Sequence, residues 1–544
     1  MATILYDFTR LVARRNAETP TGIDRVDLQY ACHLLANFRN EVVFVAQNTG
    51  KLHYVPVDVA EIFLTQLRDR WFHIHRSSLE IDLTDEFRKF GVLESKPATV
   101  KAPPARQPAP KQKREGVTAK DVKEMHELSI FGRWSTLCRI ELRGYLPRRL
   151  KWFSSAPRPL QYAVFVPISL FPSLISPLAR TTSPPGTSQS RPASKQADPA
   201  VAPAEDKRID ITASPSRIAT PLAIFLATQA KRPITYVNMS HHGLLDSELF
   251  IELKTAYRAE FIIYIHDIIP IEYPEYCRPG SKKDHIRRIE NINKVNAFLI
   301  FNSIDTSNRV NTFFDLNFAR RPKSIVSYIG ADNVAHSAGT PKALFSEPYF
   351  VMVGTIEGRK NHLGLLQVWR DIAMGEKLTP KLIIIGKRGW NNASVVDMLE
   401  LCDTIKPHVL ELNDLADDQL FGIVRSASAM LFPSFSEGWG MPLVEALSLG
   451  VPVICSDIPV FREASRGVAE YIHPLDLQKW RTTILEYAAP ESARRAAAVA
   501  RIADYHPPSW QDMFDQFDAV LEKIGDSCPQ IEKPESKLHN RSST

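Results

Sequence analysis

The sequence predicts an α/β chain with two doubly wound domains, the first of which is interrupted by a proline-rich insertion. Two observations support this. Short apolar strands alternate with amphipathic helical segments, a pattern typical of parallel sheets covered on both faces. The prolines are concentrated, since 18 of the 39 lie between Pro97 and Pro221. We therefore expect a first domain made of residues 1–95 and 216–344, an insertion at 96–215, and a second domain at 345–505.

Five strands are expected in the first domain. They are short stretches, and most are rich in β-branched or aromatic residues. Residues 21–38 carry apolar residues at helical spacing and should form a helix between the first two strands. The expected strands are 2–9, 41–47, 234–239, 260–267 and 297–303.

The second domain alternates strands and helices with greater regularity. Its expected strands are 349–354, 381–386, 409–413, 429–434, 452–457 and 469–474, and the segments between them have helical spacing. Two such domains should create a ligand cleft at the carboxyl ends of their strands. A helix at 506–524 and a disordered polar tail at 525–544 should follow.

Composition excludes several classes of protein. The six cysteines are far apart and form no CxxC pair, which argues against a structural zinc site and fits a reducing compartment such as the cytoplasm. The start lacks the apolar core of a secretory signal. A net charge of +6 over 544 residues is too small to indicate nucleic acid as a partner. The absence of G-x-G-x-x-G and G-x-x-x-x-G-K-[ST] patterns disfavours nicotinamide dehydrogenases and P-loop ATPases.

The most informative stretch is 429–457, where a buried strand leads through a glycine-bearing turn into a helix. Gly438 and Gly440 allow close backbone approach to a ligand, and the helix start offers free N–H groups to a phosphate. Glu437 and Glu445 are eight residues apart, roughly 12 Å if all helical. That spacing suits one carboxylate for a sugar and one for a ribose; the alternative is a solvated loop acid and a solvated helix acid.

This stretch, SEGWGMPLVEA, resembles the signature of the family four glycosyltransferases, which have the GT-B fold of two Rossmann-like domains facing a cleft. The resemblance implies that Glu437 contacts the transferred sugar and that Glu445 holds the ribose. It also implies that the amides near Gly440 and Met441 meet the diphosphate.

Three further segments follow the same family pattern. In VGTIEGRKNH, Arg359 and Lys360 look like the basic pair at the donor diphosphate, although two surface cations would give the same sequence. In TPTGIDRVDLQY, Gly22 matches the glycine turn after the first strand, or is only a tight turn. In YIHDIIPIEYPEY, His266 resembles the family's active-site histidine, which lies beside the transferred sugar. The alternative is a structural role, which is the more common one for a lone histidine.

The resemblance implies a retaining hexosyltransferase, with mannose from GDP-mannose as the favoured donor. The acceptor would be a glycan or a polyprenyl-linked glycan in surface polysaccharide biosynthesis. His266, Glu437 and Lys360 are the expected catalytic residues. No cofactor is expected, because the nucleotide-sugar is a substrate. No metal is expected, because the motif has no nearby HxxxH, DxD-type acidic pair or Cys cluster. The alternatives are a GT-B glucan synthase or phosphorylase, and a catalytically idle GT-B scaffold at a membrane.

The insertion has its own chemistry. Residues 96–158 contain 15 Lys or Arg and 5 Asp or Glu, a balance of 15 − 5 = +10, followed by an uncharged run at 159–179. Four prolines in that run argue against a transmembrane helix. Two interpretations stay open: an interfacial patch that holds a cytoplasmic enzyme on the inner face of the cytoplasmic membrane, and a disordered basic linker.

Overall fold

The computed structural model describes residues 2–72, 88, 90, 216–229, 232–331 and 344–526. The insertion predicted at 96–215 and nearly all of the predicted tail lie outside these residues. Among the helices of the described residues, none is both long and apolar enough to span a lipid bilayer.

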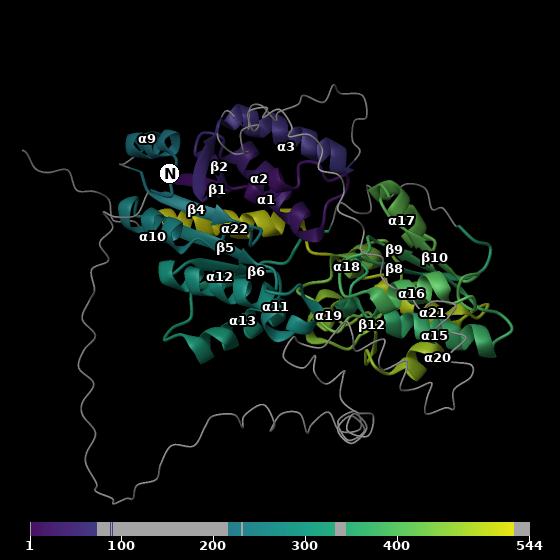
Figure 1. The fold of residues 1–544 in the computed structure, drawn as a ribbon. Coiled ribbons are helices and arrows are strands. Elements are labelled where there is room, and N and C mark those ends of the chain that lie inside the picture. Colours follow the sequence, from purple (N-terminus) through teal and green to yellow (C-terminus); the bar gives the residue numbers. More distant parts are fainter. Residues whose placement is uncertain are drawn as a thin grey trace, which may run out of the picture. The chain divides into compact units, whose positions relative to one another are not determined.

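The first domain is built on a seven-stranded sheet in the order β3-β2-β1-β4-β5-β6-β7 (Figure 1). All its neighbouring pairs are parallel except β2 and β3. The strands are β1 (Thr3–Asp7), β2 (Val42–Asn48), β3 (Lys51–Val55), β4 (Ile234–Asn238), β5 (Glu260–Ile265), β6 (Phe298–Phe301) and β7 (Ser324–Val326). The helical elements are α1 (Thr9–Ala13), α2 (Gly22–Asn37), α3 (Val57–Phe72), α9 (Thr220–Thr228), α10 (Ser247–Ala256), α11 (Ile269–Glu272), η4 (Pro274–Tyr276), α12 (Ser281–Val295) and α13 (Ile304–Asn317).

The second domain has a six-stranded parallel sheet in the order β10-β9-β8-β11-β12-β13. Its strands are β8 (Tyr349–Val353), β9 (Lys381–Ile385), β10 (Val409–Leu412), β11 (Ala429–Phe432), β12 (Val453–Ser456) and β13 (Glu470–Ile472). Its helical elements are η5 (Gly358–Lys360), α15 (His362–Gly375), α16 (Ala393–Leu401), α17 (Asp417–Arg425), α18 (Met441–Ser448), α19 (Pro459–Ala464), α20 (Leu477–Ala488) and α21 (Ala493–Ile502). Helix α22 (Trp510–Asp526) follows.

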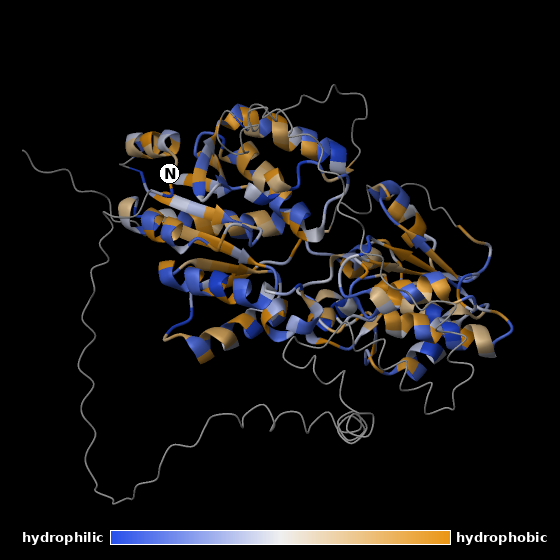
Figure 2. Cartoon of the chain, in the orientation of Figure 1, coloured by the Kyte–Doolittle hydropathy of each residue, from blue (hydrophilic) through white to orange (hydrophobic). Residues whose placement is uncertain are grey.

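Both sheets are buried on their two faces, and this is why apolar runs predicted them. In β1, Ile4 and Tyr6 pack into one core cluster and Leu5 into the other. In β8, Val351 and Phe350 likewise belong to different clusters. Figure 2 shows the strands as mainly hydrophobic, between helices that carry both colours. The α/β, doubly wound fold predicted from the sequence is confirmed, and each of the eleven expected strands coincides with a strand.

Strands β3 and β7 were not predicted. β3 pairs antiparallel with β2 through a two-residue turn, in which Thr49 has φ 48° and Gly50 has φ 73°. Positive φ at both central positions is the geometry that matches the twist of a hairpin. The strand itself carries no apolar run, and β7 has only three half-buried residues.

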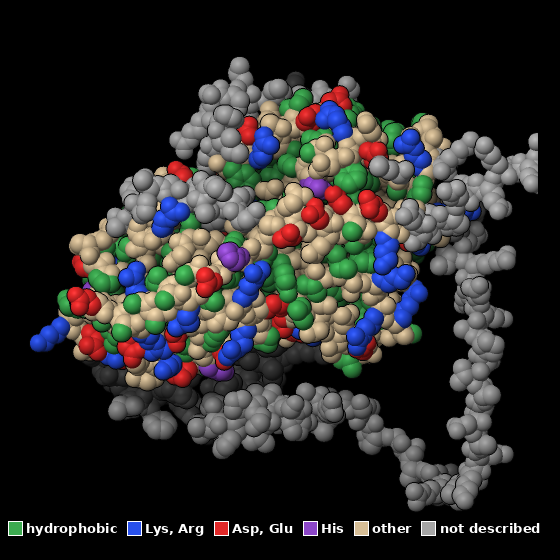
Figure 3. Space-filling model, turned by 180° about the vertical axis from the view of Figure 1, so that it is seen from behind, with side chains coloured by type: hydrophobic (Ala, Val, Ile, Leu, Met, Phe, Trp, Pro, Cys, Tyr) green, Lys and Arg blue, Asp and Glu red, His purple; other side chains and the backbone are tan. Residues whose placement is uncertain are grey.

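Helix α22 returns from the second domain to the first. Its Phe517 ring lies 4.9 Å from the Tyr30 ring on α2, and His33 on the same helix is 2.8 Å from Asp518. Figure 1 shows α22, in yellow, beside β4. On the face seen in Figure 3, basic and acidic side chains of the described residues are interspersed, with hydrophobic ones scattered between them.

Candidate functional site

The predicted site residues gather where the strand order of the second sheet reverses. In this sheet the chain runs from β8 through β9 to β10 on one side, and then crosses over to β11, β12 and β13 on the other side of β8. The loops after the two strands at such a point form a crevice in doubly wound sheets. The loop after β8 carries Arg359 and Lys360, and the loop after β11 carries Glu437 and Gly438.

Glu437 is the centre of a buried ionic cluster. Its carboxylate forms ion pairs with Lys360 Nζ at 2.6 Å and Arg359 NH1 at 2.7 Å, and it accepts a hydrogen bond from Ser434 Oγ at 3.0 Å. Burial raises the pKa of this carboxyl, but the two cations outweigh it and lower the pKa to about 2. Glu437 is 7% exposed, so the alternative of a solvated loop acid does not hold.

Arg359 and Lys360 differ in how their donors are used. Arg359 contacts Glu357 Oε1 at 2.6 Å, the Ser436 carbonyl at 2.6 Å and Glu437. It therefore ties the loop after β8 to the loop after β11. Lys360 is 8% exposed and makes one ion pair, with its Nζ also 4.7 Å from the centre of the Phe432 ring. An ammonium has three N–H donors, so Lys360 keeps donors for a ligand. Neither residue is a surface cation.

Gly438 brings the two domains into contact. A Cβ at this position would lie 2.0 Å from the carbonyl oxygen of His266. The Gly438 carbonyl accepts hydrogen bonds from Ser303 Oγ at 2.9 Å and Thr306 Oγ1 at 3.1 Å, both in the first domain. The absence of a side chain at Gly438 is therefore required by domain docking. Its predicted role toward a nucleotide-sugar stays a prediction.

His266 follows β5, at the carboxyl edge of the first sheet. Its Nε2 lies 2.7 Å from the Met239 carbonyl, and its backbone N–H donates to His241 Nε2 at 2.8 Å. Because a carbonyl only accepts, Nε2 carries the proton and Nδ1 is left as an acceptor. Burial lowers the pKa of the ring to about 4. A neutral ring suits hydrogen bonding to a hydroxyl group better than proton donation at neutral pH.

Gly440, Met441 and Gly22 meet at two helix starts. Gly440 precedes α18 with φ 105°, a conformation that favours glycine, and no side chain caps this helix start. Gly22 is the first residue of α2, and a Cβ there would lie 3.0 Å from Met441 Sδ. The start of α2 is fixed by a capping box between Thr21 and Asp24.

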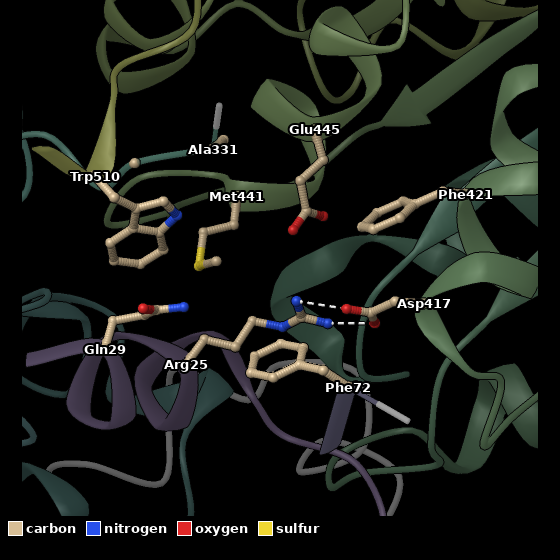
Figure 4. A pocket seen from close by; sticks show the side chains of 10 residues that line it. Arg25, Gln29, Phe72, Ala331, Asp417, Phe421, Met441, Glu445 and Trp510 are labelled. Carbon is tan, nitrogen blue, oxygen red and sulfur yellow. Dashed lines mark hydrogen bonds and ion pairs between the residues drawn. The ribbon is translucent and has the colours of Figure 1, made fainter. Parts of the chain in front are cut away.

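Glu445 lies in a small pocket that both domains line (Figure 4). Arg25, from α2, spans the pocket and binds Asp417, from α17, through two contacts of 2.6 and 2.9 Å. Glu445 is 9% exposed, which excludes a solvated helix acid. Burial raises the pKa of its carboxyl to about 7; Arg25 opposes the rise and Asp417 adds to it.

The structure thus brings the predicted residues into two neighbouring groups, linked by the turn from Glu437 to Met441. One group holds Arg359, Lys360, Glu437, Gly438 and His266. The other holds Gly22, Met441 and Glu445. Sequence reasoning missed Arg25 and Asp417. Arg25 comes one helical turn after Gly22, which was a usable signal, but nothing local links it to an aspartate 392 positions away.

Among the described residues, no group of three or more His, Cys, Asp or Glu side chains could hold a metal ion. The two groups offer two carboxylates, two cations, a neutral imidazole and an uncapped helix start. Such an arrangement can bind a polyhydroxylated, phosphorylated ligand without proton transfer by histidine.

Two doubly wound domains in contact through their carboxyl edges define a GT-B fold, as predicted. Residues 342–467 match the family described as "Glycosyl transferases group 1". The match confirms, for the second domain, the resemblance seen in the motifs.

Two proteins of similar sequence are named as mannosyltransferases. "Serotype-specific mannosyltransferase WbdA" of Escherichia coli is 30% identical over 275 residues, 46% of this chain and 34% of the relative. "O-antigen chain mannosyltransferase B" of Escherichia coli is 31% identical over 168 residues, 31% of this chain and 44% of the relative. The chain thus spans about a third of the length of WbdA. A solved sucrose-phosphate synthase from Thermosynechococcus elongatus aligns with a TM-score of 0.41 at 15% identity, over 56% of this chain and 78% of that one.

Proposed function

We propose that the chain is a retaining mannosyltransferase that moves mannose from GDP-mannose to a hydroxyl group of a glycan or polyprenyl-linked glycan. The observation that carries the proposal is the buried cluster of Lys360, Arg359 and Glu437 beside the uncapped start of α18. Cations and helix starts are the groups that stabilise a departing nucleoside diphosphate. The names of the relatives favour mannose and surface polysaccharide.

In this proposal each residue has a separate task. Lys360 and the Met441 amide bind the diphosphate and stabilise the charge that develops on it. Glu437 accepts hydrogen bonds from the hydroxyls of the transferred sugar, and His266 Nδ1 accepts a further one. Glu445 binds the ribose in the pocket of Figure 4. Retention follows if the acceptor hydroxyl attacks from the face that the diphosphate leaves, with the diphosphate taking up its proton.

The test is transfer by the purified chain. GDP-mannose and UDP-glucose are each supplied with mannose oligosaccharides, with a polyprenyl diphosphate glycan and with a glucan. We expect release of GDP and a product whose new linkage is α by NMR, with activity retained in excess EDTA. Lys360→Ala is expected to lower turnover by about 10²–10³-fold, and the matched control Lys387→Ala, at an exposed lysine paired with Asp414, is expected to keep wild-type turnover.

The other outcomes separate the alternatives. Transfer from UDP-glucose to glucan alone would contradict the mannose proposal and support a glucan synthase. A protein that binds neither nucleotide-sugar would support the idle scaffold. Binding of the wild-type chain to anionic liposomes, compared with a chain in which residues 96–215 are replaced by a Gly/Ser linker, tests the proposed membrane face of the insertion. Equal binding would leave the linker interpretation.

A further inference from the structure

The turn after β4 holds His266 at two points. This turn comprises residues 239–242 and lies beside the end of β5, because β4 and β5 are neighbours in the sheet. The Met239 carbonyl lies 2.7 Å from His266 Nε2, and His241 Nε2 accepts a hydrogen bond of 2.8 Å from the backbone N–H of His266. The first contact fixes the ring, and the second fixes the backbone that carries it. None of the roles assigned above involves the His241 side chain.

The backbone N–H of His266 has its partner outside the strand ladder. Strand β5 ends one residue earlier, at Ile265, and its pairing with β4 ends at Ile263. His266 is 4% exposed, and a buried N–H without a hydrogen bond is costly. The His241 ring therefore takes the place that a strand carbonyl would have. Asn302 Nδ2 donates to the His266 carbonyl at 2.8 Å, so both backbone polar groups of His266 are held by side chains.

The turn is itself held in a fixed shape. The Oδ1 atom of the buried Asn238 accepts from the Ser240 N–H at 3.1 Å, and its Nδ2 donates to the His242 carbonyl at 2.8 Å. His241 has φ 61°, in the left-handed region that residues other than glycine seldom adopt. Such conformations persist where the surrounding structure enforces them, and they cluster at functional sites. The turn thus directs the His241 ring at His266 despite an unfavourable backbone conformation.

The His241 ring can accept this hydrogen bond only in its neutral form. Since Nε2 accepts the His266 N–H, the ring proton is on Nδ1. Burial, followed by the charges of His266 and His285, lowers the pKa of His241 well below its ordinary value. The His241 ring also packs edge-on against the His266 ring, with 5.1 Å between the ring centres and 73° between the planes. A change at His241 therefore acts on His266 through its backbone and through its ring.

We propose that His241 is a positioning residue for His266. Its Nε2 fixes the His266 backbone, so that the His266 ring keeps Nε2 on the Met239 carbonyl and leaves Nδ1 as an acceptor for a sugar hydroxyl. This inference rests on the proposed function, in which His266 Nδ1 contacts the transferred sugar. It adds to that function the residue that sets the orientation of the imidazole.

Two substitutions separate the acceptor atom from the bulk of the ring. His241→Gln carries an amide oxygen that can take the position of Nε2, whereas His241→Leu fills similar space without an acceptor. Turnover of the full chain with GDP-mannose and a glycan should fall by about 10- to 100-fold in His241→Leu, because a misplacement of about 1 Å can cost about 10²-fold. His241→Gln should recover most of this turnover.

Affinity for GDP provides the first control. It should be unchanged in both variants by calorimetry, because the proposed contacts to the ribose and the diphosphate do not involve His241. A general loss of structure would instead lower turnover and GDP affinity together. His506→Leu, at an exposed histidine, is the matched control and should keep wild-type turnover.

NMR spectra of the full chain with nitrogen-labelled histidine report which ring nitrogen of His266 carries the proton. The His266 signals are those missing from the spectrum of His266→Gln. The proton should be on Nε2 alone in the wild type and in His241→Gln, and shared between both nitrogens in His241→Leu. This readout needs no transfer reaction. A wild type that transfers no mannose, but whose His266 tautomer is disturbed in His241→Leu, contradicts the proposed function and supports the positioning role.

His241→Asn provides a second variant without the acceptor, should His241→Leu fail to fold. Asparagine suits the left-handed conformation, but its shorter side chain does not reach the His266 N–H. It should unfold near the wild-type temperature and disturb the His266 tautomer as His241→Leu does. An unchanged His266 tautomer in either folded variant overturns the proposal, whatever the turnover. Turnover of His241→Gln as low as that of His241→Leu also overturns it, because the acceptor atom would then not be the cause.

Discussion

Glu445→Gln is expected to weaken nucleotide binding and at the same time to stabilise the fold at pH 8. Burial raises the pKa of Glu445 from 4.5 to about 7. At about 1.36 kcal/mol per pH unit, holding the ionised carboxylate in this pocket costs about 3 kcal/mol. The sign follows from the raised pKa: the protonated form is favoured in the fold, so stability is highest below pH 4.5 and falls as pH rises toward 7. Glutamine carries no such cost.

Urea denaturation at pH 4.5 and pH 8 measures the effect of Glu445 ionisation on the free energy of unfolding. The free energies of unfolding of the wild type and Glu445→Gln should be similar at pH 4.5. At pH 8 the variant should be more stable by up to about 3 kcal/mol. Glu275→Gln, a change at an exposed glutamate, serves as the control and should show no such difference.

The same prediction also concerns nucleotide binding. Only the ionised carboxylate accepts two hydroxyl hydrogen bonds, so calorimetric affinity of the wild type for GDP should fall about tenfold from pH 8 to pH 6, ~1.4 kcal/mol. Glu445→Gln should bind weakly at both pH values. A variant that is destabilised at pH 8, or a wild type whose affinity does not depend on pH, would refute the reasoning about this pocket.

Three further predictions concern the neighbouring groups. Lys360→Ala should lower turnover by about 10²–10³-fold with little change in unfolding temperature, because it removes one contact to the leaving diphosphate; normal turnover would make Lys360 structural. Glu437→Gln should lower the free energy of unfolding by about 3 kcal/mol at pH 7, since the carboxyl pKa is about 2 in the fold, and in urea titrations this loss should shrink as pH falls from 4.5 toward 2. A double-mutant cycle of Arg25→Ala and Asp417→Ala should give a coupling energy of about 0.5–3 kcal/mol for nucleotide binding; purely additive effects would show that the pair does not organise the pocket.

The sequence predicted those parts of the molecule whose cause is local. Apolar runs predicted the strands because both sheets are covered on both faces. The loop after β11 could be located because strand, glycine turn and helix start follow one another within a dozen residues. The β2–β3 hairpin escaped prediction because its second strand is an edge with mixed residues, and its turn signal, Thr49–Gly50, is weaker than Asn-Gly.

What could not be predicted is how the two domains meet. The sequence suggested that Gly438 lacks a side chain in order to admit a ligand, but in the fold its Cβ position is occupied by the His266 carbonyl. That carbonyl is itself held by Asn302 Nδ2 at 2.8 Å, and Ser303 beside it binds the Gly438 carbonyl. The motif loop of one domain therefore packs directly on the backbone that presents His266 in the other. Since Glu437 precedes Gly438, any ligand that shifts this glycine also shifts the carboxylate of Glu437 relative to the His266 ring. The position of each predicted sugar contact thus depends on a contact between distant segments that no single motif encodes.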